Sequence, residues 1–87
     1  ITYPNYFTPN NDGYNDRWNI DLPEDYNGII SIYDRYGKLM KQMSAYGMGW
    51  DGTYNGQLLP STDYWFKVEY NEDNTRKEFK SHFTLKR

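Results

Sequence analysis

Residues 63–86 read DYWFKVEYNEDNTRKEFKSHFTLK, and two runs of alternating apolar and polar side chains fill this stretch. In each run, every second residue is predominantly aromatic or aliphatic. Alternation of period two is typical of antiparallel strands that bury one face and expose the other. The polar tip NEDN between the runs favours a turn. We therefore predict two long antiparallel strands, at 63–71 and 76–86.

The rest of the chain is divided by short turn signals such as Asp12-Gly13, Asn55-Gly56 and Asp51-Gly52. No window repeats apolar side chains at helical spacing, so no helix longer than a single turn is expected. Many short strands with this punctuation predict an all-β fold, an antiparallel immunoglobulin-like β-sandwich of about seven strands. The predicted strands span residues 1–7, 17–21, 28–34, 38–43, 56–59, 63–71 and 76–86.

Composition limits the class of protein. The chain has 87 residues, which suits one domain, and aromatic side chains make up 20% of it, which suits a small core built from large rings. With 0 cysteines it has neither a disulfide framework nor a thiolate metal site. A net charge of -2 argues against nucleic acid as a partner. No apolar run is long enough to span a membrane, and no signal peptide is visible. The chain begins at Ile1 rather than Met, so we expect a fragment of a larger protein.

The segment Tyr3–Trp18 reads YPNYFTPNNDGYNDRW and predicts an ordered loop. Its prolines remove backbone donors, and its Asn, Asp and Gly residues favour turns with positive φ. Two interpretations stay open: a calcium site, because calcium prefers oxygen ligands, or Asx-turns that satisfy the loop's own backbone. The closing Glu of an EF-hand loop is missing, which favours the Asx-turns. The candidate calcium ligands are Asn10, Asp12, Asn15 and Asp16.

Aromatic residues raise a second question. Trp50 precedes a tight turn, where it could stack on a sugar or cap one end of the sandwich, and the second role is the commoner one for Trp. Five other aromatic residues fall at strand or loop positions that could leave them outward, where they would suit glycan binding, or they fill a small core and its rim. These five are Tyr14, Tyr33, Tyr46, Tyr54 and Trp65.

No catalytic constellation is visible. His82 is the only histidine, and its neighbour Ser81 points to the opposite face of the predicted strand. We therefore predict that the chain is not an enzyme. The last strand carries Arg76, Lys77, Lys80, Lys86 and Arg87. Such basic residues protect a strand edge against pairing between molecules, or they present the edge to a partner, and both interpretations stay open.

Four blocks of sequence, in this order, resemble a known family. They are YPNYFTPNNDGYNDRW at 3–18, ISIYDRYGKL at 30–39, GWDGTYNGQLLPSTDYWFKV at 49–68 and FTLKR at 83–87. Over nearly its whole length the chain is similar to the gliding motility-associated C-terminal domain. This family is the type B sorting domain of the type IX secretion system of Bacteroidetes.

The resemblance implies a non-catalytic secretion signal on a larger secreted protein. It implies export of the N-terminal cargo through the periplasm and the outer membrane, to the cell surface or the medium. The implied partners are outer-membrane components of the translocon, including a protein of the PorP/SprF kind. We expect the partner-facing residues on the last strand, and the loop 10–16 as a second candidate. The alternative functions are a carbohydrate-binding module and a structural Ig-like spacer of a surface protein. The expected partner-facing residues are Lys80, His82, Thr84, Lys86 and Arg87.

Overall fold

The computed structural model describes all residues from Ile1 to Arg87, and nearly all regular structure in it is β. A single turn of 3-10 helix, Glu24–Tyr26, is the only helical element, and none of the chain forms a helix able to cross a membrane. The predicted all-β class is therefore confirmed. The strands are β1 (Tyr6–Phe7), β2 (Ile29–Tyr33), β3 (Leu39–Ser44), β4 (Thr53–Tyr54), β5 (Gln57–Leu58), β6 (Thr62–Glu72) and β7 (Thr75–Leu85).

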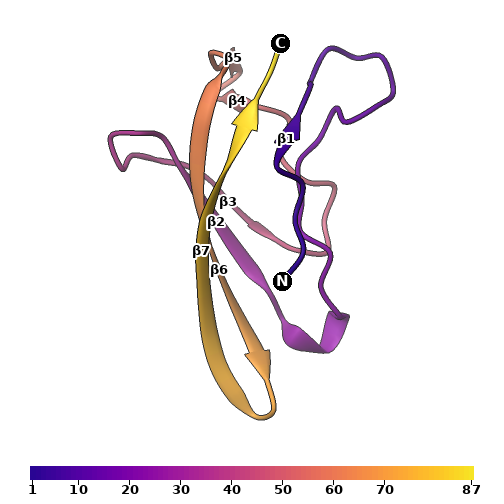
Figure 1. Cartoon of the computed structure of the whole chain (residues 1–87), viewed down its shortest axis with the longest axis vertical. Coiled ribbons are helices and arrows are strands. Elements are labelled where there is room, and N and C mark those ends of the chain that lie inside the picture. Colours follow the sequence, from indigo (N-terminus) through magenta and orange to yellow (C-terminus); the bar gives the residue numbers. More distant parts are fainter.

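Five strands form one twisted sheet in the order β1-β7-β6-β2-β3, and β4 and β5 form a separate small hairpin (Figure 1). The hairpin of β6 and β7 provides the longest strand pairing in this sheet. Its antiparallel pairs run without a break from Thr62↔Leu85 to Glu72↔Thr75. Asp73 and Asn74 close the turn, both with positive φ, at 52° and 63°. The two long strands predicted from the alternation are confirmed, and each of their ends lies one residue from its predicted position.

The first strand differs from the prediction in length and direction. The predicted strand 1–7 shrinks to β1, and β1 runs parallel to β7 rather than antiparallel, with Tyr6 opposite Thr84 and Phe7 opposite Leu85. Pro4 lacks a backbone donor, which is consistent with pairing that begins only after it. The direction of β1 depends on where the chain enters the fold, and a local pattern carries no information about that.

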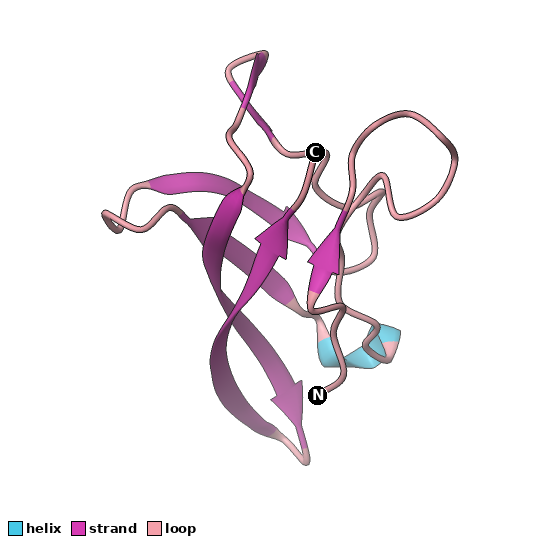
Figure 2. Cartoon of the chain, turned by 45° about the horizontal axis from the view of Figure 1, so that its top comes forward, coloured by secondary structure: helices cyan, strands magenta, loops and turns pink.

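The inner face of the sheet is covered mainly by irregular chain, and the β4–β5 hairpin projects at one end of the sheet (Figure 2). The predicted strand 17–21 is wrong: only one bridge forms there, between Trp18 and Trp50, with N···O distances of 2.9 and 2.8 Å. At this point, hydrogen bonds of the Asn19 side chain take the place of a backbone hydrogen-bond ladder between strands. Its amide donates to the carbonyls of Ala45 and Gly47, each at 3.1 Å, and its oxygen accepts the N–H of Ile20.

Aromatic rings fill the space between the two layers. Phe83 lies at the centre, stacked on Trp18 with ring centroids 4.0 Å apart. Four more rings surround Phe83 at 5.9–6.4 Å, those of Phe7, Trp50, Tyr64 and Phe66. Ile30 and Ile32 of β2 complete this face of the core and are fully buried. The prediction that Trp50 caps the core is also confirmed, since Trp50 is 1% exposed and its indole N–H donates to the carbonyl of Thr53.

Two glycines allow the chain to pass close to this core. Gly49 has φ +88°, and a Cβ there would meet the carbonyl oxygen of Trp18 at 2.8 Å. Gly52 has φ +81°, and a Cβ there would meet Leu85 at 2.9 Å and the guanidinium of Arg87 at 3.2 Å. Side chains rarely adopt such a φ, so both positions favour glycine. The turn that carries Trp50 and Asp51 is therefore built against the end of β7.

Candidate functional site

β1 covers the C-terminal end of β7. The N–H of Thr84 donates to the carbonyl of Asn5 and the N–H of Lys86 donates to the carbonyl of Phe7, both at 2.9 Å. The pairing with β1 includes only Thr84 and Leu85, so the part of β7 before Thr84 has no strand on that side. The basic last strand is thus a sheet edge over residues 75–83 and an interior strand only at Thr84 and Leu85.

Three of the predicted partner-facing residues, Lys80, His82 and Thr84, lie on the outer face of the sheet. Lys80 pairs with Glu78 at 3.2 Å, and His82 Nδ1 lies 3.8 Å from the carboxylate of Asp63. The hydroxyl of Thr84 donates to the same carboxylate at 2.6 Å. Lys80 and His82 are exposed and Thr84 is half-buried, so the first two are directly accessible to a partner.

The last two residues differ from each other in what their side chains contact. The ammonium group of Lys86 lies 4.6 Å above the exposed ring of Tyr6, in cation–π geometry. The guanidinium of Arg87 instead folds back onto the domain, where it donates to the carbonyls of Leu59 at 2.7 Å, Gly52 at 2.8 Å and Pro9 at 3.4 Å. Arg87 therefore connects three separate loops, which sequence reasoning did not anticipate.

The loop of residues 8–16 closes on its own side chains. Both carboxylate oxygens of Asp16 are used: one accepts the N–H groups of Asn10 and Asn11 at 3.1 and 2.9 Å, and the other accepts that of Gly13 at 2.8 Å. Asn10 and Asp12 each accept the N–H two residues further on, at 3.2 and 2.8 Å, which is the Asx-turn geometry.

These bonds bear on the calcium interpretation. The structure places no group of three or more His, Cys, Asp or Glu side chains where they could hold a metal ion. Of the four candidate ligands, Asn10, Asp12 and Asp16 have side-chain oxygens that already accept backbone hydrogen bonds, and Asn15 has a left-handed backbone at φ 51°. The contacts therefore favour the Asx-turns, and a calcium titration tests the alternative interpretation.

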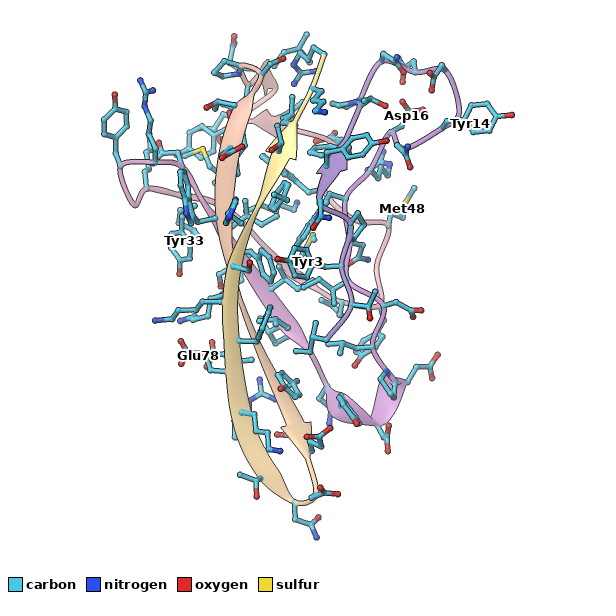
Figure 3. All side chains as sticks on the ribbon, in the orientation of Figure 1. Tyr3, Tyr14, Asp16, Tyr33, Met48 and Glu78 are labelled. Carbon is cyan, nitrogen blue, oxygen red and sulfur yellow. The ribbon has the colours of Figure 1, made fainter.

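The five aromatic candidates for a glycan platform are dispersed. Tyr14 is 77% exposed at the far end of its loop and points away from the body of the domain (Figure 3). Tyr46 is held by its hydroxyl, which donates to the carbonyl of Pro23 at 2.6 Å and accepts the N–H of Gly28. The ring of Tyr54 lies under the ammonium group of Lys38, at 4.7 Å. Only the remaining two, Tyr33 and Trp65, share one surface.

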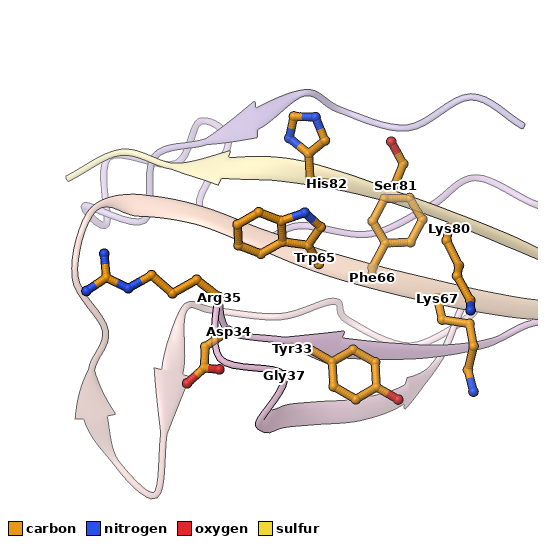
Figure 4. Close-up of a pocket in the computed structure, with 10 residues that line it drawn as sticks. All are labelled: Tyr33, Asp34, Arg35, Gly37, Trp65, Phe66, Lys67, Lys80, Ser81 and His82. Carbon is orange, nitrogen blue, oxygen red and sulfur yellow. The ribbon is translucent and has the colours of Figure 1, made fainter.

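Tyr33 and Trp65 belong to a shallow groove on the outer face of the sheet (Figure 4). Tyr33 is paired with Trp65 between β2 and β6, and Trp65 with His82 between β6 and β7, so these three form one row across the sheet. Lys67 and Lys80 form the next row. Arg35, in the turn after β2, lies at the other end of the groove. Sequence analysis did not identify Arg35 and Lys67, because only the register between strands brings them beside Trp65.

No arrangement for nucleophilic catalysis is present. Ser81 contacts the hydroxyl of Tyr3 on the inner side of the sheet, whereas His82 contacts Asp63 and Trp65 on the outer side. Figure 3 shows the same separation in Tyr3 and Tyr33, which lie on opposite sides of the sheet. The hydroxyl and the imidazole therefore point away from each other, as the alternation predicts.

Shifted pKa values occur away from the groove. At the tip of the β6–β7 hairpin, Glu72 accepts hydrogen bonds from Lys77 at 2.6 Å and from Tyr26 at 2.9 Å. These bonds lower the pKa of Glu72 and raise those of Lys77 and Tyr26. Burial raises the pKa of Tyr64. Hydrogen bonds from Thr53 lower the pKa of Asp51, beside the C-terminus. The bond from Tyr26 fastens the 3-10 turn to β6, the bond from Lys77 joins the two strands of the hairpin, and the bonds from Thr53 are local to one turn, so none suggests a proton-transfer site.

Comparison with known proteins gives one match. A protein family described as the CHU_C type IX secretion signal domain matches residues 1–85. No curated protein and no solved structure matches the chain. The matched range includes the 8–16 loop, the groove and all of β7, so the family signal covers the whole of the fold described above.

Proposed function

The chain belongs to the CHU_C type IX secretion signal domain family, and we propose that residues 1–87 form one type B sorting domain at the C-terminal end of a larger secreted protein. Membership makes the domain a sorting signal of the type IX secretion system. Such a signal is a non-catalytic module that directs attached cargo out of the cell, to the surface or the medium. The resemblance noted in the sequence is thereby confirmed at the level of the family.

The observation that carries the proposal is the closed core. Thirteen buried apolar side chains form one cluster within the 87 residues. Every large ring at its centre is provided by the domain itself, and no buried side-chain polar atom lacks a hydrogen-bond partner. A signal attached to different cargo proteins has to fold independently of them, and this core provides that independence.

We infer that the recognition surface is the C-terminal end of the domain together with the outer face of β7. Lys80, His82 and Lys86 are exposed there. Arg87 joins this end to the 8–16 loop through the carbonyl of Pro9, which supports a surface composed of both segments. Arg87 serves that surface by positioning its loops rather than by offering a free guanidinium. Thr84 contributes through its bond to Asp63.

The proposed partner is the outer-membrane translocon, with a PorP/SprF-like protein as the component that reads the domain. The cargo passes through the periplasm and the outer membrane. The domain itself is proposed to lack enzymatic activity and to need no cofactor, since its candidate calcium ligands bond the loop backbone. Neither nucleic acid nor a membrane span enters this proposal.

The test is export of a reporter fused in front of residues 1–87, in a bacterium with a working type IX system. Most of the reporter should leave the cell. Removing the last strand is an ambiguous variant, because Phe83 and Leu85 are buried and their loss would unfold the domain. Lys80→Glu combined with Lys86→Glu changes only exposed side chains, and reporter should then accumulate in the periplasm.

Lys41→Glu is the matched control, because Lys41 is exposed on β3, at the opposite edge of the sheet. It should export normally. Retention of the reporter by the intact domain would contradict the proposed function. Equal export of the two charge-reversed forms would show that the surface lies elsewhere, and export without any domain would make it a structural spacer.

A carbohydrate-binding module is the second candidate, on a specific observation: Trp65 is 41% exposed beside Tyr33 in the groove. Binding of the isolated domain to an array of neutral glycans, lost in Trp65→Thr, would favour it.

A further inference from the structure

The three tryptophans of the chain have different surroundings. Trp18 and Trp50 are buried, and their indole N–H groups donate to the carbonyls of Pro4 at 2.8 Å and Thr53 at 3.0 Å. Trp65 is 41% exposed, and its indole N–H donates to no group of the domain. It nevertheless lies on β6, the central strand of the five-stranded sheet. An exposed Trp at the centre of a sheet face is costly to solvate and typical of a binding surface.

The side chains around Trp65 are mostly hydrogen-bond donors. Three cations, Arg35, Lys67 and Lys80, line the groove, in a chain whose net charge is -2. The one carboxylate in the lining is that of Asp34, and its Oδ1 already accepts the N–H groups of Tyr36 and Lys38, at 2.9 Å each. Lys and Arg side chains donate and cannot accept. The ligand that fits this lining therefore supplies acceptors, and preferably negative charge.

The guanidinium of Arg35 donates to the hydroxyl of Tyr36 at 2.9 Å, at the exposed surface, whereas the two lysines are held only by weak ion pairs. Lys67 and Lys80 pair with Glu69 at 3.6 Å and with Glu78 at 3.2 Å, at the surface, where such pairs contribute little stability. Neither Glu residue lines the groove. Figure 4 shows Arg35 at one end, Lys67 and Lys80 together at the other, and Trp65 between them. A ligand with two separated negative charges and an apolar middle would match this order.

From this geometry we propose that the groove of Tyr33, Arg35, Trp65, Lys67 and Lys80 is a docking site for an extended acidic peptide segment of a partner protein. Trp, Tyr and Arg are the residue types that dominate binding energy at protein–protein interfaces, and all three meet here. A neutral glycan fits less well, because its hydroxyl groups need acceptors as well as donors. The identification of the partner with the export machinery rests on the proposed function, whereas the docking site itself does not.

The test uses the 87-residue domain and a fluorescein-labelled decapeptide in which Glu alternates with Ser around a central Leu. Fluorescence anisotropy should show saturable binding that weakens as salt is added. The same peptide with Gln in place of Glu should bind at least about tenfold more weakly.

Two variants test the aromatic part and the charged part of the groove separately. Trp65→Thr and the double variant Lys67→Glu with Lys80→Glu should each weaken binding about tenfold or more. Lys41→Glu, outside the groove, should bind like the parent. A thermal melt of each variant checks that the fold is retained, and the double variant keeps the test valid if Trp65→Thr is unstable.

Several outcomes would overturn the proposal. They are no saturable binding at millimolar peptide, equal binding of the Gln peptide, and unchanged binding by both variants. Displacement of the labelled peptide by cellohexaose or polymannuronate at lower concentration than by unlabelled peptide would make the groove a glycan site. Each result is independent of reporter export, so a failed docking site and a failed sorting function are distinguishable.

Discussion

The two faces of β6 differ sharply in exposure and in what their side chains contact. Facing the core, Tyr64, Phe66 and Val68 are at most 2% exposed. Facing outward, Trp65 is 41% exposed, and Lys67 and Glu69 pair with each other at the surface. These six residues are consecutive in the chain. Pleating alone sends neighbours to opposite sides.

This contrast separates stability from recognition. The inner face is bound to a ring cluster that the domain needs in order to fold, so changes there alter the free energy of unfolding. The side chains of the outer face make few contacts within the domain, so changes there alter what the domain binds. A sorting signal benefits from the separation, because its recognition surface can vary without loss of the fold.

The largest expected effect comes from the inner face. Phe83→Ala removes the ring that contacts Phe7, Trp18, Trp50, Tyr64 and Phe66. We expect a loss of about 3–5 kcal/mol in the free energy of unfolding, which is most of the stability of a small domain. Urea unfolding measures it, with Lys80→Ala as the outer-face control on the same strand. A loss below about 1 kcal/mol would contradict the central place of this ring.

The next largest effect concerns Arg87, and it tests whether this C-terminal residue stabilises the fold or serves only to bind a partner. Arg87→Ala removes the donors to the carbonyls of Leu59, Gly52 and Pro9, and should cost about 1–2 kcal/mol. Arg87→Lys keeps the charge but not the fork of donors and should recover only part of this. Lys86→Ala, one residue earlier, should change the melting temperature by a few degrees at most. Equal melting of all three would place Arg87 wholly on the recognition side.

The 8–16 loop supports a prediction of similar type. Asp16→Ala removes the acceptor for three backbone N–H groups, of Asn10, Asn11 and Gly13, and should cost about 1 kcal/mol. Hydrogen exchange at these three amides should rise in the variant and remain unchanged elsewhere.

A calcium titration followed by melting temperature tests the metal interpretation of this loop. A bound ion stabilises the folded state by mass action, so a calcium site would raise the melting temperature of the parent at millimolar calcium. We expect no shift, because the loop oxygens already accept backbone bonds. A clear rise, abolished in Asp16→Ala, would favour the metal interpretation.

Trp65→Thr sharpens the contrast from the outer face. The side chain is 41% exposed and its indole N–H has no partner in the domain, so unfolding should change by less than about 1 kcal/mol. Threonine keeps the strand preference. The same variant should weaken binding of the acidic peptide about tenfold or more. A destabilisation as large as that of Phe83→Ala would remove the distinction between the two faces.

The smallest expected effect depends on pH. Hydrogen bonds from Thr53 lower the pKa of Asp51 below its ordinary value of 3.8. The stabilisation is therefore present above that value and is lost as pH falls through the lower, folded pKa. Asp51 is partly exposed, so the contribution should stay below about 1 kcal/mol. Urea unfolding between pH 5 and pH 2 should show a shallower acid loss for Asp51→Asn than for the parent. A steeper acid loss for Asp51→Asn than for the parent would show that the ionised Asp51 does not stabilise the fold.

The comparison also explains which predictions succeeded. Alternation placed Tyr64, Phe66 and Phe83 inward and His82 outward correctly, because side-chain direction in a strand is a local property. The predicted strand at 17–21 was wrong because the side chain of Asn19 took the bonds that a neighbouring strand would have made. Local propensity carries no record of such a competition.

Residue types and their spacing within single segments were enough to specify the all-β class, the long C-terminal hairpin, the aromatic core and the family. The parallel pairing of β1 with β7, the turn of Arg87 back onto three loops, and the meeting of Arg35 and Lys67 with Trp65 in one groove became apparent only in the folded chain. These features depend on which segments become neighbours and in what register. That choice minimises the free energy of the whole chain, and no single stretch of sequence encodes it.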